Sequence, residues 1–211
     1  MINNAKLIDD LVNDLKPNRY RPPLVRTLLW FLFVVLFIAV GMIYIQPWRV
    51  NFVDHLLNFP RFSLEIVSAS AFTFFVIYWV FTSFVPGNRL SKTSLYLGLG
   101  FLLIYAFSIV ASFLTPSPPA SSLGARPHCV EEVFVFGIIG AMSLCYFLMK
   151  IDYQVRPTVR FLLGMGAAFI PGTLMQMACM YNPLHAFLFH YLPCLIVGFI
   201  FTSPLIYKLK I

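Results

Sequence analysis

Six stretches of the chain are long and apolar, and they constrain the fold more than any other feature. They cover residues 24–45, 64–85, 94–114, 133–149, 161–180 and 184–207. A helix needs about 20 apolar residues to cross a hydrocarbon core of about 30 Å. Because 60% of the 211 residues are hydrophobic and only 11% are charged, an ordinary soluble domain is excluded. The stretches have helical length rather than the short alternating pattern of a β-barrel, so they predict an all-α integral membrane protein with six transmembrane helices.

Lysine and arginine gather in alternate connections between these apolar stretches. Twelve of the 15 fall in the N-terminus, the second and fourth connections and the C-terminus, and three fall in the other connections. In membrane proteins the cytoplasmic loops hold the excess of positive charge. We therefore predict that both termini are cytoplasmic. The net charge of +7 then reflects this orientation and the anionic lipids of the inner leaflet, and it requires no nucleic-acid partner.

The four cysteines differ in depth along the predicted helices. Cys129, in "RPHCVEE", and Cys179, in "QMACMYNPLHAF", both fall on the outer side of the membrane. With a rise of about 1.5 Å per residue, Cys145 and Cys194 lie roughly 15–20 Å further in and do not reach Cys129. The two outer cysteines therefore share a membrane level. A disulfide, a soft-metal site and two unrelated small residues are the alternative interpretations.

The same outer layer contains other groups that bind metal ions. These groups are His55, His128, Glu131, Glu132 and His185. Thiolates and imidazoles ligate soft metals, but no closely spaced Cys-x-x-Cys or His-x-x-x-His motif supports that interpretation here. The histidines also suit the polar membrane interface, and the glutamates suit the positive N-terminal end of a helix. A soft-metal ion at Cys129 and Cys179 stays open, and we expect no other cofactor.

Two titratable residues fall inside the predicted spans. His190 lies deeper than His185 in the sixth apolar stretch, and Glu65 lies near the outer start of the second. Such residues are functional candidates because an ionisable group inside a membrane is costly. The sequence offers no evident partner for His190, so we expect a neutral, hydrogen-bonded histidine there, and we treat Glu65 with the same caution.

The segment before the first apolar stretch has a helical pattern of its own. In "NNAKLIDDLVNDLKPNRYRPP", apolar residues recur on one helix face and aspartates lie on or near the other, as far as Pro17. Three aspartates suit an anionic bilayer poorly, and a helix this short is marginal in water. We predict a short amphipathic helix that becomes ordered in a protein groove. The chain then divides into a cytoplasmic arm, residues 1–23, and a six-helix transmembrane domain, residues 24–211.

Three segments together resemble the NrsF family of bacterial membrane anti-sigma factors: "LIDDLVNDLKPNRYRPP", the "HC" before the fourth apolar stretch, and "MACMYNPLHAFLFHYLP". The resemblance extends over essentially the full chain. It implies a multi-pass inner-membrane protein that holds an extracytoplasmic-function (ECF) sigma factor inactive at the cytoplasmic face. It also implies that paired outer cysteines, here Cys129 and Cys179, sense metal or oxidative stress; we add the nearby His128 and His185 as candidates. The residues that would bind the sigma factor are Leu7, Ile8, Asp9, Leu11, Asp14 and Leu15.

Two other classes of protein are weaker alternatives. A membrane redox enzyme needs a reactive cysteine pair, but the two outer cysteines are 50 residues apart and lack a Cys-x-x-Cys motif. A bis-histidine haem site is disfavoured because His185 and His190 lie five residues apart on one helix. A small transporter would be expected to show an inverted repeat or intramembrane charges. We find no inverted repeat, and intramembrane charges are scarce. We therefore expect a signalling protein rather than an enzyme, with an ECF sigma factor and the lipid bilayer as partners.

Overall fold

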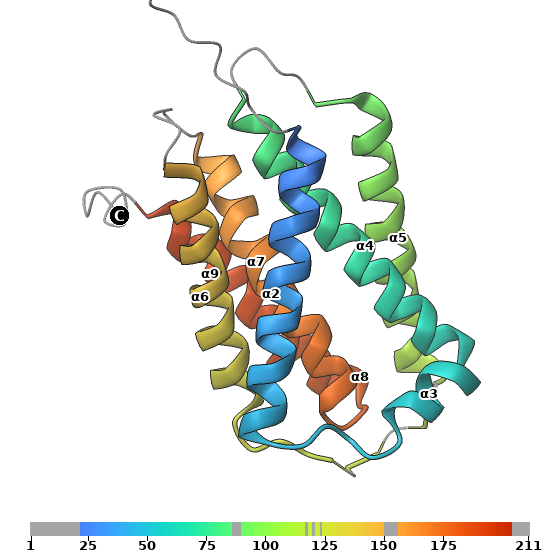
Figure 1. Cartoon of the computed structure of the whole chain (residues 1–211). Coiled ribbons are helices and arrows are strands. Elements are labelled where there is room, and N and C mark those ends of the chain that lie inside the picture. Colours follow the sequence, from blue (N-terminus) through green and yellow to red (C-terminus); the bar gives the residue numbers. More distant parts are fainter. Residues whose placement is uncertain are drawn as a thin grey trace, which may run out of the picture.

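A computed structural model describes residues 22–85, 90–116, 118–119, 121–122, 124–149 and 156–203. Six helices in these ranges are long and apolar enough to span a membrane, and no strand occurs there, which confirms the predicted fold class (Figure 1). The predicted arm helix, with Leu7, Ile8, Asp9, Leu11, Asp14 and Leu15, lies outside the described residues.

The spans have sharper limits than the apolar stretches suggested. The first five are α2 (Pro23–Ile45), α4 (Pro60–Ser83), α5 (Lys92–Leu114), α6 (Cys129–Met149) and α7 (Pro157–Ala178). The sixth consists of α8 (Pro183–His185), the π-helix η1 (Ala186–Tyr191) and α9 (Leu192–Thr202). Four of the spans begin with proline, which lacks a backbone N–H and therefore suits the first position of a helix. The sequence did not predict the short helix α3 (Phe52–Asn58) between the first two spans.

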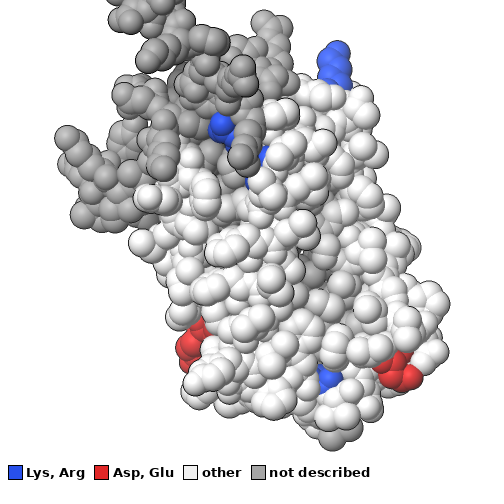
Figure 2. All heavy atoms as spheres, viewed as in Figure 1, with Lys and Arg blue, Asp and Glu red and all other residues white. Residues whose placement is uncertain are grey.

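Helix α7 lies at the centre of the bundle and contacts α2, α4, α6, α9 and η1. About 83% of its membrane-spanning window is buried, against 22% for α2 and for α5, which lie at the periphery. The exposed side chains of these two outer helices are mainly apolar, such as Leu32 and Phe107. Figure 2 shows one side of the bundle almost free of charged side chains, which lie near its two ends. This surface suits contact with lipid acyl chains.

Small residues on α7 bring the sixth span close. A Cβ added to Gly164 would lie 2.8 Å from the carbonyl oxygen of Val197, and one added to Gly172 would lie 2.9 Å from the carbonyl oxygen of His190. Close backbone approach through small residues is the usual way in which membrane helices associate. At Gly172 it fixes the distance between α7 and the π-helix.

An even number of spans places the described chain ends, residues 22 and 203, at the same end of the bundle. The connections that carry Cys129 and Cys179 lie at the opposite end (Figure 1). The cytoplasmic location of the termini stays a prediction from the distribution of positive charge.

Candidate metal centre

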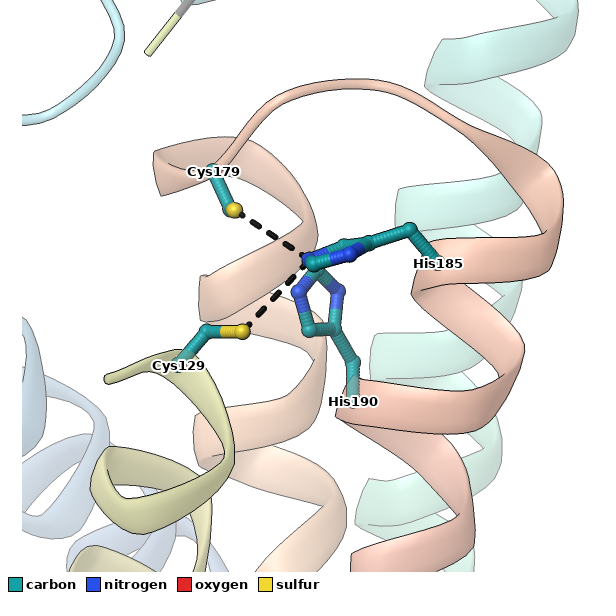
Figure 3. Close-up of side chains that lie close together, drawn as sticks. All are labelled: Cys129, Cys179, His185 and His190. Atoms are coloured by element: carbon teal, nitrogen blue, oxygen red, sulfur yellow. Dashed lines mark hydrogen bonds between the residues drawn. The ribbon is translucent and has the colours of Figure 1, made fainter. Parts of the chain in front are cut away.

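Four potential metal ligands meet where three spans end. Cys129 begins α6, Cys179 follows the last residue of α7, His185 ends α8, and His190 belongs to η1. One ligand atom from each residue lies within 4.8 Å of every other (Figure 3). We call this set the Cys₂His₂ cluster.

Two distances in the Cys₂His₂ cluster match those of a tetrahedral metal site. Nε2 of His185 is 3.4 Å from Sγ of Cys129 and 3.5 Å from Sγ of Cys179. Bond lengths of about 2.3 Å to sulfur and about 2.0–2.1 Å to nitrogen place sulfur and nitrogen ligands about 3.5 Å apart on a tetrahedron. Both cysteines are free thiols, not a disulfide. Two thiols and two imidazoles are a donor set for Zn²⁺ or another soft ion.

The π-helix brings the two histidines together. At about 100° per residue in an α-helix, residues five apart point about 140° away from each other. In η1 the hydrogen bonds run from residue i to i+5, and the rings of His185 and His190 are 5.0 Å apart between centroids. The five-residue spacing therefore does not separate these two histidines. Pro193 was the available sequence signal for the π-helix, because a proline lacks the N–H that would continue regular α-helical bonding to residue 189.

His190 differs from the prediction of a hydrogen-bonded histidine. Its side chain is fully buried, and neither ring nitrogen has a hydrogen-bond partner. Buried polar atoms are nearly always paired, so an imidazole without a hydrogen-bond partner beside two thiols is suited to bind a metal ion. Figure 3 shows its ring directed toward the cluster. A metal ion would satisfy the nitrogen that it binds.

Several groups favour the thiolate form of Cys179. A hydrogen bond from the thiol of Cys129, the neighbouring His190 ring and the backbone N–H of Arg126 lower the pKa of Cys179 below the usual value of a thiol, although burial acts in the opposite direction. Arg49 adds a positive charge near Cys179. Its backbone N–H donates to the carbonyl of Ala178, at 3.1 Å, and its guanidinium is buried without a hydrogen-bond partner. Thiolates are the form that binds metals.

The segments that carry the ligands are held in place by polar contacts. The Asn182 side chain accepts from the backbone N–H groups of Leu184, at 3.0 Å, and His185, at 3.1 Å, and so caps the start of α8. Three residues before Cys129, the buried guanidinium of Arg126 forms a 2.9 Å ion pair with Glu132. This anchors the connection to the first turn of α6.

Arg126 also links the Cys₂His₂ cluster to the first span. Its guanidinium donates to the carbonyls of Met42, at 2.9 Å, and Gln46, at 3.0 Å, at the end of α2. The Met42 carbonyl also accepts from the backbone N–H of Gln46, at 3.1 Å, and Gln46 lies just past the last helical residue, so Arg126 adds donors at this helix end. Cys129 and the end of α2 are therefore joined through one side chain.

The remaining candidate residues lie apart from the cluster. His128 is exposed and lies 3.6 Å from a carboxylate oxygen of Glu131, and it does not belong to the set of four. His55, on α3, stacks edge-on against Phe59. Cys194 lies deeper, where its thiol donates to backbone carbonyls of the bundle. Of the four candidates named from the sequence, the structure brings Cys129, Cys179 and His185 together with His190 and leaves His128 outside the cluster.

Comparison with known proteins gives no relative: no protein-family model, no curated protein and no solved structure matches this chain. The fold and the Cys₂His₂ cluster define a six-helix membrane protein with a candidate metal centre at one end.

Proposed function

We propose that this protein is a bacterial inner-membrane anti-sigma factor that senses a soft metal ion. In this proposal the arm, residues 1–23, holds an ECF sigma factor at the cytoplasmic face. The transmembrane domain releases it when an ion binds on the outer side. The observation that carries the proposal is the Cys₂His₂ cluster, at the end of the bundle opposite to the start of α2. The resemblance of the arm and cysteine segments to the NrsF family supplies the partner.

The composition of the cluster favours a metal ion over an oxidant as the signal. A disulfide requires only the two cysteines, and it leaves the unpaired imidazole of His190 unexplained. A metal ion uses all four side chains. Thiol oxidation is the second candidate, because Cys129 and Cys179 are free and their sulfurs lie within 4.8 Å of each other.

Ion binding has a structural route to the arm. The four ligands come from three spans, so an ion would favour the arrangement in which α6, α7 and the sixth span converge. Arg126 joins the segment before Cys129 to the end of α2, whose other end continues into the arm. A ligand shifts a conformational equilibrium only through a difference in affinity between two states. We propose that the arm binds its partner in the ion-free state.

The test is co-purification of a soluble partner with the solubilised, ion-free protein. We expect the full chain to retain the sigma factor and a chain lacking residues 1–16 to lose it while still inserting in the membrane. The matched control is His128→Ala, because His128 lies outside both the arm and the cluster. Undiminished capture by the shortened chain would contradict the assigned role of the arm.

A further inference from the structure

A second buried polar cluster lies outside the candidate metal centre, around Glu65 of α4. This carboxyl group is fully buried. It contacts Ser108 Oγ at 3.2 Å and Ser112 Oγ at 2.6 Å, both on α5. It also contacts Gln176 Nε2, on α7, at 2.8 Å, and the hydroxyl of Tyr181, in the connection to α8, at 3.0 and 3.1 Å. One carboxyl group thus joins three parts of the bundle.

Counting hydrogens shows that this cluster needs one more than its hydroxyls supply. Glu65, Ser112 and Tyr181 contact one another pairwise, at 2.6 Å, 2.9 Å and 3.0 Å. These distances fall in the range of O–H···O hydrogen bonds, and each such bond requires one hydrogen. The two hydroxyls supply two hydrogens for three contacts. Ser112 Oγ also lies 2.9 Å from the carbonyl of Ser108, which competes for the same hydrogen. A protonated carboxyl group supplies the one that is lacking.

The charges around Glu65 agree with a neutral acid. In the described part of the chain no cation lies within ion-pair distance of it. Arg61, one turn earlier on α4, is electrostatically favourable to a carboxylate, but it donates to Thr115 instead. The other titratable groups that face Glu65 are the tyrosines Tyr105, Tyr181 and Tyr191. An ionised carboxylate without a cation is costly inside a membrane.

We propose that Glu65 is a proton-binding site that holds its proton at neutral pH and closes a ring of hydrogen bonds between α4, α5 and the α7–α8 connection. Loss of the proton would place a negative charge in the bundle and leave one contact of the ring without a hydrogen. Tyr181, two residues after Cys179, belongs to this ring, and Gln176, three residues before Cys179, donates to the same carboxyl group. The site would control how freely the segment around Cys179 moves. The inference does not depend on the sigma-factor role.

Infrared spectroscopy of the reconstituted full chain tests this directly. An ordinary glutamate, with a pKa of about 4.3, keeps its proton in about one molecule in 500 at pH 7. We expect instead about one neutral carboxylic acid per molecule at pH 7, detected by its C=O stretch and absent in Glu65→Gln. The matched control is Glu131→Gln, which removes an exposed glutamate and should leave this band unchanged. A carboxylate band that disappears in Glu65→Gln at pH 7, without an acid band, would overturn the proposal.

A second variant tests the ring if Glu65→Gln fails to fold. Tyr181→Phe removes one hydroxyl and leaves Glu65 in place. We expect the acid band to persist at a shifted frequency, because the carboxyl group loses one hydrogen-bond partner. A band in Tyr181→Phe that does not move, or a wild-type chain with no acid band at pH 7, would overturn the proposal.

Discussion

Among single residues, His190 would gain the most from an ion in the Cys₂His₂ cluster. Its imidazole is buried and unpaired, whereas the His185 ring already contacts both sulfurs. An unsatisfied buried group carries a desolvation cost of about 1–3 kcal/mol. Metal binding recovers that cost, so His190 should contribute to affinity although it is the deepest of the four ligands.

Each ligand should matter for metal binding, and the nearby candidates should not. Four-ligand zinc sites bind with about 10–16 kcal/mol, or about 3 kcal/mol per ligand, so the loss of one should weaken binding about 100-fold. We expect this for Cys129→Ser, Cys179→Ser and His190→Ala, measured by competition with a zinc chelator. Binding should also weaken as the pH falls, because protons compete for thiolates and imidazoles.

The controls for this experiment are His128→Ala and Cys145→Ser, which should bind zinc as the wild type does. His128 is exposed, and Cys145 lies outside the cluster. Loss of affinity in His128→Ala as large as that in His190→Ala would contradict the assignment of the fourth ligand.

The sequence could place three members of the Cys₂His₂ cluster at one membrane level but not the fourth, and the reason is physical. Membrane level follows from a fixed rise per residue, so Cys129, Cys179 and His185 could be assigned to one end. Rotation about the helix axis depends on local hydrogen bonding, which a π-helix alters. His128 has the right level, but its side chain points to solvent. The contacts of Glu65 depend on how α4, α5 and α7 pack, which one sequence does not give.

Among the elements, the sixth span shows how far apolar length predicts structure. The length of the apolar stretches correctly predicted six spans, because the thickness of a bilayer sets the length of a helix that crosses it. It could not predict that this span changes from α8 to η1 to α9. A π-turn accommodates one extra residue and is found frequently at functional sites. In this span it aligns His185 with His190.

Deleting Leu188 should convert the π-helix to an α-helix and keep the metal centre. His190 would then follow His185 by four positions, which leaves the two only about 40° apart on a regular helix. Leu188 is exposed, so little packing is lost. We expect zinc affinity within about tenfold of the wild type, a loss of at most about 1.4 kcal/mol. The reason is that a local shift of one ligand should cost less than its removal.

The comparison is a chain that lacks both Leu188 and Phe189. The second deletion should rotate the rest of α9 by about 100° against α7 and abolish tight binding. If the single deletion binds zinc as poorly as His190→Ala while staying helical and monodisperse, the role of η1 is wrong.

For the whole molecule, the Cys₂His₂ cluster lies at the end of the bundle opposite to the start of α2, the helix that follows the arm in the sequence. The described structure joins the two ends through Arg126 and the body of that helix. Coupling between the two ends requires two states of the bundle that the ion distinguishes. Three of the six spans supply the side chains of the Cys₂His₂ cluster. One bound ion would therefore favour close packing of these three spans.

Replacing both Cys129 and Cys179 with Ser should uncouple the signal from release. Without thiolates the ion no longer favours one arrangement of the bundle, so we expect sigma-dependent genes to stay near their uninduced level when soft metal is added. Capture of the sigma factor should be unaffected, and Cys145→Ser should respond normally. A normal response in the double variant, with capture intact, would contradict metal sensing by these thiols.

The central position of α7 has a consequence for how the protein is made. This helix is the least apolar of the six spans and also the most buried, so its neighbours rather than lipid surround it. A segment with Gln176 and several small residues gains less from entering the bilayer alone than α2 does. Its stable insertion during synthesis therefore relies on α4 and α6, which leave the ribosome first. The last span then completes the enclosure of α7 and carries His185 and His190, so the four side chains of the Cys₂His₂ cluster come together only when this span is in place.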